Sequence, residues 1–231
     1  MAAAKLHALL EQIHIPAERR FHSVSAAEGE FMFHWVEQHQ LRETLEIGLA
    51  FAYSAICIMA GHAAGQGTHT CIDAFQECEY QNQGLKNVEA VGFHERLEFV
   101  PEYSHHALPN LDQQGRRFDF AFIDAGHRFD QVFLDFYYVD QLLRPGGYVL
   151  FHDAWMRSTQ MVASFIRRNR RDYTRIRKTE RNLILFQKTG QADERDWDHF
   201  REFYTLRGFF SHRVVRWLIR SNWANRFFTA R

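Results

Sequence analysis

The sequence has few cysteines, few prolines, no net charge and no long apolar run. Its 231 residues include 3 Cys and 4 Pro, and 28 Lys and Arg are balanced by 28 Asp and Glu. Cys57, Cys71 and Cys78 form no C-x-x-C spacing, which argues against a disulfide framework and against a thiolate zinc site. No apolar run reaches the roughly 18 residues of a membrane span. The start of the chain, which Glu11 and His14 interrupt, is a poor secretory signal. We therefore expect a cytoplasmic protein.

The overall charge balance conceals two oppositely charged parts of the chain. Residues 1–154 carry 10 basic and 21 acidic side chains, whereas residues 155–231 carry 18 basic and 7 acidic ones. A uniformly basic nucleic-acid-binding protein is therefore disfavoured, while a basic surface toward the C-terminus is expected. Hydrophobic residues make up 46% of the chain, which suits the core of a single α/β domain with additions at its ends.

From residue 44 onward, short apolar segments alternate with segments of helical length. The expected strands are 44–49, 70–75, 97–102, 118–124 and 147–153. Five β-then-α units in succession predict a parallel, doubly wound sheet with helices on both faces. Two further apolar segments, 173–179 and 182–188, follow an expected helix over 156–172. Their connection is too short for a parallel crossover, so it predicts an antiparallel hairpin.

Helical segments are expected before and after this sheet. Residues 3–14 and 25–40 are amphipathic, and Ser25 with Glu28 has the spacing of a capping box. After Gly190 we expect two more helices, near 193–207 and 211–228. The predicted organisation is N-terminal helices over 1–40, a sheet domain over 41–190 and a basic, aromatic helical extension over 191–231.

An acidic residue stands at or near the carboxyl end of each of the five expected parallel strands: Glu46, Asp73, Glu102, Asp124 and Asp153. Ligands of doubly wound sheets bind beyond these strand ends. The glycine array of a dinucleotide fingerprint fails, because Ala50 and Tyr53 stand where its later glycines would be. The motifs of P-loop proteins, short-chain dehydrogenases and α/β-hydrolases are also absent.

The densest signal lies in the segments 118–127 (FDFAFIDAGH) and 143–153 (LRPGGYVLFHD). Their D-x-x-H and H-D patterns resemble class I S-adenosylmethionine-dependent methyltransferases, in particular small O-methyltransferases of sugars and natural products. The resemblance covers about residues 25–189. It implies a Rossmann-like, mainly parallel, seven-stranded sheet that ends in the antiparallel hairpin.

The resemblance also implies a site for S-adenosylmethionine at the strand ends. Its residues would be Glu46, Gly48, Ser54, Asp73, Phe75, Tyr103, Ser104 and Asp124. Glu46 would orient the ammonium group of the cofactor, Gly48 would let the backbone approach its methionine part, and Asp73 would accept the ribose hydroxyls. Capping of the following helix is an alternative role for Asp73. Many relatives have a second glycine where this chain has Ala52, so we expect the Ala52 methyl group to narrow the methionine pocket.

The two segments also predict the catalytic groups. A neutral hydroxyl is a poor nucleophile, so methyl transfer to it needs a base or a cation that lowers its pKa. His127 is the expected general base. Asp124 and Asp153 could together hold one divalent cation such as Mg²⁺. Imidazole is a poor Mg²⁺ ligand, so His152 is expected to be structural. The alternative is a metal-free site in which a carboxylate orients His127.

The acceptor and the C-terminal segment allow several interpretations. Phe129, Phe133 and Trp155 could line the acceptor pocket, although packing is their first interpretation. Residues 207–231 hold six arginines and no acidic residue. This segment could pack on its own domain, dock on a partner subunit of a homo-oligomer or lie on an anionic membrane surface. The alternatives to a small-molecule enzyme are a non-catalytic adaptor that acts through this segment and an RNA methyltransferase. Nucleic acid is disfavoured because the acidic strand ends would repel phosphates.

Overall fold

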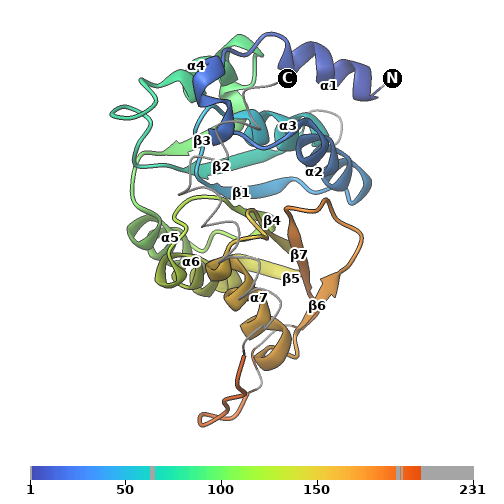
Figure 1. The fold of residues 1–231 in the computed structure, drawn as a ribbon, viewed down its shortest axis with the longest axis vertical. Helices are drawn as coiled ribbons and strands as arrows, with labels where there is room; N and C mark the ends of the chain where they lie inside the picture. The colour runs from blue at the N-terminus through green and yellow to red at the C-terminus, as the bar shows by residue number, and fades with distance from the viewer. Residues whose placement is uncertain (1, 63–65, 191–192, 194, 204–231) are drawn as a thin grey trace, which may run out of the picture.

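The computed structural model of the chain describes residues 2–62, 66–190, 193 and 195–203. Its centre is one seven-stranded sheet with the strand order β3-β2-β1-β4-β5-β7-β6 (Figure 1). The strands are β1 (Glu43–Ile47), β2 (Thr68–Ile72), β3 (Leu97–Val100), β4 (Phe118–Ile123), β5 (Leu143–Phe151), β6 (Tyr173–Ile176) and β7 (Ile184–Lys188). Strands β1 to β5 are parallel, and β7 pairs antiparallel with both β5 and β6. The predicted fold class and the predicted hairpin are confirmed.

Helices cover both faces of this sheet (Figure 1). The described helices are α1 (Ala2–Leu10), α2 (Ala26–Gln38), α3 (Tyr53–Gly61), α4 (Gln83–Ala90), α5 (Ser104–Gln113), α6 (Phe129–Leu142) and α7 (Arg157–Asn169), with 3-10 turns η1 (Ala17–His22) and η3 (His94–Arg96). Helices α5, α6 and α7 pack together on one face, while α2 and α3 pack together on the other. This arrangement follows from right-handed crossovers on either side of β1.

The core is built by the apolar strands between these two helical layers. Phe118 and Phe151 point from the sheet toward Phe136 of α6, and all three are almost completely buried. Phe120 and Phe122 of β4 point to the other face, where they meet Met32 of α2. From Phe120 on, alternate residues of β4 fill the two layers, as expected for a strand covered on both sides, whereas Phe118 departs from this alternation because the register shifts between Phe118 and Phe120. This rigid centre fixes the strand ends that carry the polar residues.

Local sequence rules hold at the N-terminal helices. The Ser25 hydroxyl accepts a hydrogen bond from the Glu28 amide, and the Glu28 carboxylate accepts one from the Ser25 amide at 2.6 Å. The predicted capping box is therefore confirmed. Helix α4 begins only at Gln83, because Gln81 and Asn82 adopt positive φ angles and the chain turns until residue 82.

The helix predicted near 193–207 is not present in the described part of that range. Residues 195–203 form a turn and chain without regular secondary structure. The side-chain amide of Asn169 forms two hydrogen bonds with the backbone of Arg201. It donates to the Arg201 carbonyl at 2.9 Å and accepts from the Arg201 N–H at 2.7 Å. The Asn169 amide thus takes the backbone groups that a helix would use internally. The helix predicted near 211–228 lies outside the described residues.

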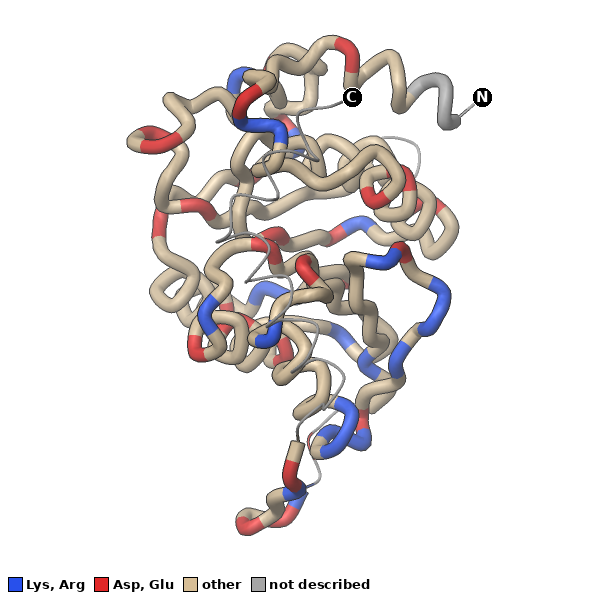
Figure 2. Tube along the Cα trace, viewed as in Figure 1, with Lys and Arg blue, Asp and Glu red and all other residues tan. Residues whose placement is uncertain are grey.

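Basic residues gather on one side of the described structure. Figure 2 shows Lys and Arg concentrated along the end of α7, β6 and the loop before β7. They include Arg167, Arg168, Arg171, Arg175, Arg177, Lys178 and Arg181. The predicted basic C-terminal surface therefore begins in the sheet domain itself. No helix among the described residues is long and apolar enough to span a membrane.

Candidate active site

One large cavity lies at the carboxyl ends of the parallel strands. It lies where the chain leaves the neighbouring strands β1 and β4 toward opposite faces of the sheet. Its volume is about 1490 Å³. The loops after β1, β2, β3, β4 and β5 all contribute to its wall, and residues 21–24 form another part of it. Among the predicted site residues, Gly48, Ser54, Asp73, Phe75, Tyr103, Ser104, Asp124, His127 and Asp153 line this cavity. The structure thus brings together residues that are up to 105 positions apart in the sequence, Gly48 and Asp153.

Glu46 does not line this cavity, but Ser54, to which it is hydrogen-bonded, does. The Glu46 carboxylate is completely buried in β1, where it accepts a very short hydrogen bond from the Ser54 hydroxyl. Its other oxygen lies 2.8 Å from Nε2 of His69, which is also completely buried. Burial raises the pKa of Glu46 and lowers that of His69 to about 3, so both groups favour their neutral forms. The contact of Glu46 with the ammonium group of a cofactor stays a prediction.

Gly48 ends β1 in a conformation that requires glycine. Its φ is +99°, and a Cβ atom would lie 2.3 Å from the backbone oxygen of Asp124. Two neighbouring strand ends, those of β1 and β4, therefore approach each other more closely than any other residue would permit. The close approach at Gly48 is thus to the backbone of Asp124, and the approach to the methionine part of a cofactor stays a prediction.

The expectation that Ala52 narrows the pocket is wrong. Ala52 is completely buried and packs in the cluster of α3 and α4, so its methyl group points away from the cavity. Its φ is +63° and that of Ala50 is +44°, and Ala50 is the residue that lines the cavity. Alanine in this left-handed region costs about 1 kcal/mol relative to glycine. The alanine at position 52, where many relatives have glycine, therefore affects the stability of the loop and leaves the pocket open.

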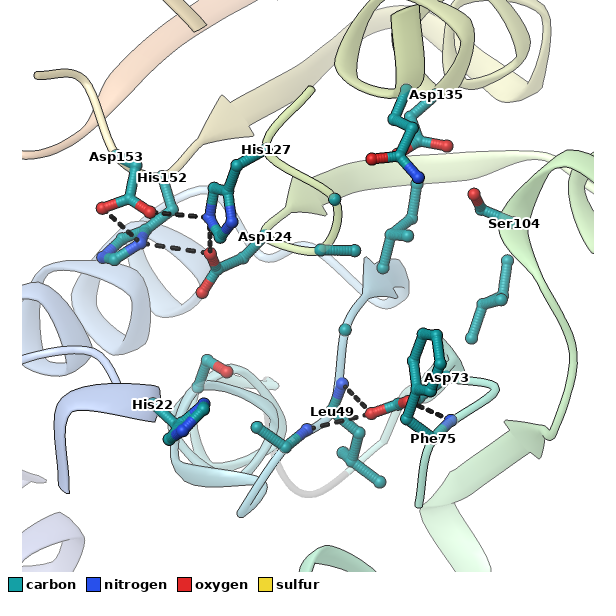
Figure 3. A pocket seen from close by; sticks show the side chains of 18 of the residues that line it. His22, Leu49, Asp73, Phe75, Ser104, Asp124, His127, Asp135, His152 and Asp153 are labelled. Atoms are coloured by element: carbon teal, nitrogen blue, oxygen red, sulfur yellow. Dashed lines mark hydrogen bonds and ion pairs between the residues drawn. The ribbon is translucent and has the colours of Figure 1, made fainter. Parts of the chain in front are cut away.

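Asp73 fixes the loop that follows β1. Its Oδ2 accepts hydrogen bonds from the amides of Leu49 and Ala50, at 3.0 and 3.1 Å, and from the Gln76 side chain at 3.0 Å. Its Oδ1 accepts one from the Phe75 amide at 2.7 Å. Oδ2 is thus fully used within the protein, and Oδ1 has one lone pair left for a ligand hydroxyl. Asp73 is 7% exposed. It lies on the cavity wall between Leu49 and Phe75 (Figure 3).

An aromatic and polar rim closes the cavity on the side of β2 and β3. Phe75 and Tyr103 meet edge to face with ring centres 5.6 Å apart, and both are more than 40% exposed. Ser104 begins α5 at this rim. Asp135, a buried residue of α6, also lines the cavity, and burial raises the pKa of its carboxyl group to about 6. The sequence offered no signal for Asp135, because it lies in the middle of a regular amphipathic helix.

His127 and Asp153 form a hydrogen-bonded pair at the other side of the cavity. Nε2 of His127 lies 2.7 Å from Oδ2 of Asp153 and 4.0 Å from Oδ1 of Asp124. The hydrogen bond to Asp153 raises the pKa of His127 above its ordinary value, because it stabilises the protonated ring. With Nε2 directed at a carboxylate, Nδ1 is the nitrogen that can take a proton from a ligand. The side chain of His127 is 45% exposed, so a ligand can reach it.

Asp153 is held in place by several partners. Its φ of +52° lies in the left-handed region, which is strained for a residue with a side chain. Oδ1 accepts hydrogen bonds from the Trp155 indole at 3.0 Å and from the Asn182 amide at 3.3 Å. Burial alone would raise the pKa of Asp153, but the hydrogen bonds with His127 and His152 outweigh it and lower the pKa. The residue therefore stays a carboxylate.

His152 lies among three carboxylates. Its Nδ1 lies 3.1 Å from Oδ1 of Asp124 and 3.5 Å from Oδ1 of Asp153, without the alignment of a hydrogen bond. Its Nε2 lies 3.4 Å from Oε1 of Glu28, in α2. Burial lowers the pKa of His152, yet these three carboxylates overcome that effect and raise it to about 12. The cluster therefore has a strongly negative potential that attracts positive charge.

Three ligand atoms in this cluster could hold a metal ion. Asp124, His152 and Asp153 each offer one atom, and these atoms lie within 4.8 Å of one another. Nδ1 of His152 is buried and has no aligned hydrogen bond, and Glu28 on the opposite nitrogen is placed as an orienting carboxylate would be. One imidazole and two carboxylates suit Mn²⁺ or another first-row ion better than Mg²⁺.

Only one of the three aromatic residues proposed for the acceptor lines the cavity. Trp155 does so, together with Met156. Phe129 and Phe133 stack on each other with ring centres 5.7 Å apart, and Phe133 packs against Phe165 of α7. Neither Phe129 nor Phe133 lines the cavity. Packing, which is their first interpretation, fits these contacts, and the alternative role in the acceptor pocket does not.

The chain segment that precedes α2 contributes residues that the sequence did not indicate. Its four residues Phe21, His22, Ser23 and Val24 line the cavity. The segment is held by Arg19, which lies over the rings of Phe51 and Tyr80, at 5.6 and 5.0 Å from their centres. Nδ1 of His22 lies 3.4 Å from the Tyr80 hydroxyl. The N-terminal part of the chain therefore covers one side of the cavity.

Several solved structures have the same fold as this chain. The structures that match include the O-methyltransferase TomG from Streptomyces achromogenes, involved in tomaymycin synthesis and crystallised with S-adenosylmethionine, at 21% identity and a TM-score of 0.65 over 82% of this chain and 90% of that chain. An O-methyltransferase from Bacillus cereus matches at 19% identity and a TM-score of 0.63, over 81% and 90% of the two chains. The methyltransferase PaMTH1 from Podospora anserina matches at 13% and 0.66, over 82% and 88%. The fold is that of the class I methyltransferases.

The central part of the sequence matches a family model. Residues 45–154 match a family model described as a methyltransferase domain. This range begins in β1 and ends just after Asp153, so it contains every strand end that lines the cavity. No curated protein matches the chain.

Proposed function

We propose that the protein transfers a methyl group from S-adenosylmethionine to a hydroxyl group of a small molecule, with His127 as the general base. The observation that carries this proposal is the pair of His127 and Asp153, joined at 2.7 Å and open to the cavity. The two O-methyltransferases among the matching structures, from Streptomyces achromogenes and Bacillus cereus, support the choice of an oxygen acceptor.

The cofactor would occupy the cavity from the loop after β1 to the rim of Phe75, Tyr103 and Ser104. Gly48 and Ser54 would meet its methionine part, with Glu46 acting through Ser54. Asp73 would accept one ribose hydroxyl through the free lone pair of Oδ1. The sulfonium group is positively charged, and Asp124 at the end of β4 supplies negative charge near the place where the methyl group must be presented.

His127 would take the proton of the acceptor hydroxyl on Nδ1 as the oxygen attacks the methyl group in line with the departing sulfur. Asp153 fixes the ring and stabilises the imidazolium that forms, as a carboxylate does in other His-based sites. A divalent cation held by Asp124, His152 and Asp153 would lower the pKa of the acceptor hydroxyl when bound. Glu28 would keep the His152 ring oriented in that site.

The acceptor side of the cavity favours a natural-product-like molecule with an apolar ring over a free sugar. Phe21, Val24, Trp155 and Met156 present apolar surface there, and His22 and Ser23 are polar residues among their neighbours. Aromatic and apolar walls with few polar groups are typical of sites for flat organic molecules.

The test uses wild-type protein and the variant His127→Ala with a panel of phenols, catechols and glycosides. Methylated products are detected by mass spectrometry, and binding of S-adenosylhomocysteine is measured by calorimetry as a control. We expect methylation of at least one ring hydroxyl by the wild type, a loss of about 10²–10⁴ in rate for His127→Ala, and unchanged cofactor binding. Equal rates in the two proteins would refute the role of His127. A wild type that binds cofactor but methylates nothing in the panel would favour a non-catalytic adaptor.

A further inference from the structure

A basic surface without partners lies outside the candidate active site. It is formed by exposed side chains at the end of α7, in β6 and in the loop before β7 (Figure 2). We call this set the basic stripe, and its members are Arg167, Arg171, Arg175, Arg177, Lys178 and Arg181. Among the described residues, none of these six side chains forms an ion pair or a hydrogen bond. By contrast, Arg116, Arg144 and Arg170 bind carboxylates at 2.6, 2.5 and 2.7 Å.

The members of the basic stripe repel one another. Arg167 lies in the last turn of α7, which packs on β6, while Arg175 lies in β6 and Arg177 directly follows it. Burial, together with the charges of Arg167 and Arg177, lowers the pKa of Arg175. Residues 155–190 hold ten basic side chains and two acidic ones, so this part of the chain supplies few carboxylates to neutralise the stripe. A negatively charged partner would relieve this repulsion.

The end of α7 is also the place where the C-terminal segment is attached. Phe203 packs on Phe165 of α7 with ring centres 5.3 Å apart, and the backbone of Arg201 binds Asn169 at the end of the same helix. Four positions after Phe203 begins the segment 207–231, with six arginines, six Phe or Trp residues and no acidic residue. Four residues of chain span at most about 14 Å. The sequence therefore attaches a basic and aromatic segment beside the basic stripe.

We propose that the basic stripe docks the protein on the surface of a membrane that contains anionic lipids. Lys and Arg are attracted to such a surface, and Trp and Phe enter its headgroup region. The stripe supplies the first kind of residue, and the segment 207–231 contains both kinds. This inference does not depend on the proposed function, because it uses no residue of the candidate active site.

The position of the stripe favours a membrane over a nucleic acid. The stripe ends at Arg181, and the next residue, Asn182, donates a hydrogen bond to Asp153 at 3.3 Å. The carboxylates of Asp124 and Asp153 therefore lie close to this end of the stripe, where they would repel a phosphate backbone that follows it into the cavity. A membrane contacts only the outer surface of the protein, so these half-buried carboxylates oppose it less.

A purely protective role of the stripe predicts a different result. Strand β6 is the edge of the sheet, and charged side chains on an edge strand prevent pairing with another chain. In that case the removal of the charges would promote self-association, and there would be no membrane binding to lose. Binding to vesicles, measured at a protein concentration where all variants are monomeric, therefore separates the two roles.

The experiment is co-sedimentation of the full chain with vesicles of phosphatidylcholine alone and of phosphatidylcholine with phosphatidylglycerol in equal parts. The test variant removes three charges around β6: Arg167→Gln/Arg175→Gln/Arg177→Gln. The matched control removes three exposed charges outside the stripe: Arg20→Gln/Arg42→Gln/Lys86→Gln. If circular dichroism shows that the test variant does not fold, it is replaced by a variant of the other three members: Arg171→Gln/Lys178→Gln/Arg181→Gln.

We expect the wild type to bind the vesicles with phosphatidylglycerol and not those of phosphatidylcholine alone. It should be released when the salt concentration rises from about 0.1 to about 1 M, because the Debye length falls from about 10 to about 3 Å. Each Lys or Arg near an anionic surface strengthens binding by about fivefold. The test variant should therefore bind about 100-fold more weakly than the wild type, and the control variant about as tightly as the wild type.

Several results overturn the inference. Equal binding of the wild type to both kinds of vesicle, or binding to neither, shows that the stripe does not dock on anionic lipid. Wild-type affinity in the test variant shows that other residues make the contact, and an equal loss in the test and control variants shows that only net charge matters. If the wild type binds single-stranded RNA more tightly than the vesicles, and the test variant loses that binding, the stripe is a nucleic-acid surface instead.

Discussion

The substitution Asp73→Asn tests how the loop after β1 is held. An asparagine can keep one acceptor oxygen and must place an amino group where the other oxygen was. At Oδ2 that amino group would face three donors, from Leu49, Ala50 and Gln76. At Oδ1 it would face one, the Phe75 amide, so the amide should turn that way.

The cost can be worked out from these contacts. One buried donor loses its partner, at about 1–3 kcal/mol. The three remaining bonds lose their charge assistance, which weakens each of them further. We expect a loss of about 2–3 kcal/mol in the free energy of unfolding, which is about 4–12 °C in Tm for a chain of this size. Affinity for S-adenosylhomocysteine should fall as well, because the Gly48–Ala50 loop is no longer fixed.

Thermal and urea denaturation followed by circular dichroism measure this effect, and calorimetry measures the affinity. The matched control is Asp112→Asn, which breaks an exposed ion pair with Arg117 and should change stability by less than about 1 kcal/mol. An Asp73→Asn protein with wild-type Tm and wild-type affinity would refute the reasoning, because four bonds to one carboxylate would then contribute nothing.

Three further predictions follow from the site and its surroundings. The double variant His127→Ala/Asp153→Asn should lose hardly more methylation rate than His127→Ala alone, because the two residues act as one unit; additive losses would contradict this. Dialysis against EDTA should lower the methylation rate, and Mn²⁺ should restore it better than Mg²⁺; full activity in EDTA would show that the base works without a cation. Burial lowers the pKa of His62 to about 3 in the folded protein, whereas the pKa in the unfolded chain is 6.5. The contribution of the neutral His62 ring to stability is therefore fully present above pH 6.5 and is lost as the pH falls from 6.5 to 3. In His62→Gln, urea denaturation should therefore show a pH slope that is smaller by about 1.4 kcal/mol per unit in this window, and an unchanged slope would contradict the assignment.

The sequence predicted best those features that depend on short segments or on topology. The capping box of Ser25 and Glu28 needs only three residues of spacing, and the β6–β7 hairpin follows from a connection too short for a crossover. The strand ends share one edge because parallel strands all point the same way, so Asp73, Asp124 and Asp153 had to meet at one cavity. These inferences needed no knowledge of side-chain packing.

The features that the sequence missed depend on contacts between distant segments. Glu28 and His152 are 124 positions apart, and only the packing of α2 against the end of β5 brings them together. Ala52 faces the core because the loop after β1 turns its methyl group inward. The helix near 193–207 was a reasonable inference from composition, yet the Asn169 amide binds the backbone of Arg201 in the described part of that segment, which is not helical.

The central claim is that the cavity is built for the cofactor of methyl transfer, and calorimetric titration of the wild-type protein with S-adenosylhomocysteine tests it most directly. The account predicts one-to-one binding with a Kd in the micromolar range, about −8 kcal/mol. The same titration on Asp73→Asn should show weaker binding. No heat of binding to the folded wild type up to millimolar S-adenosylhomocysteine would contradict the account.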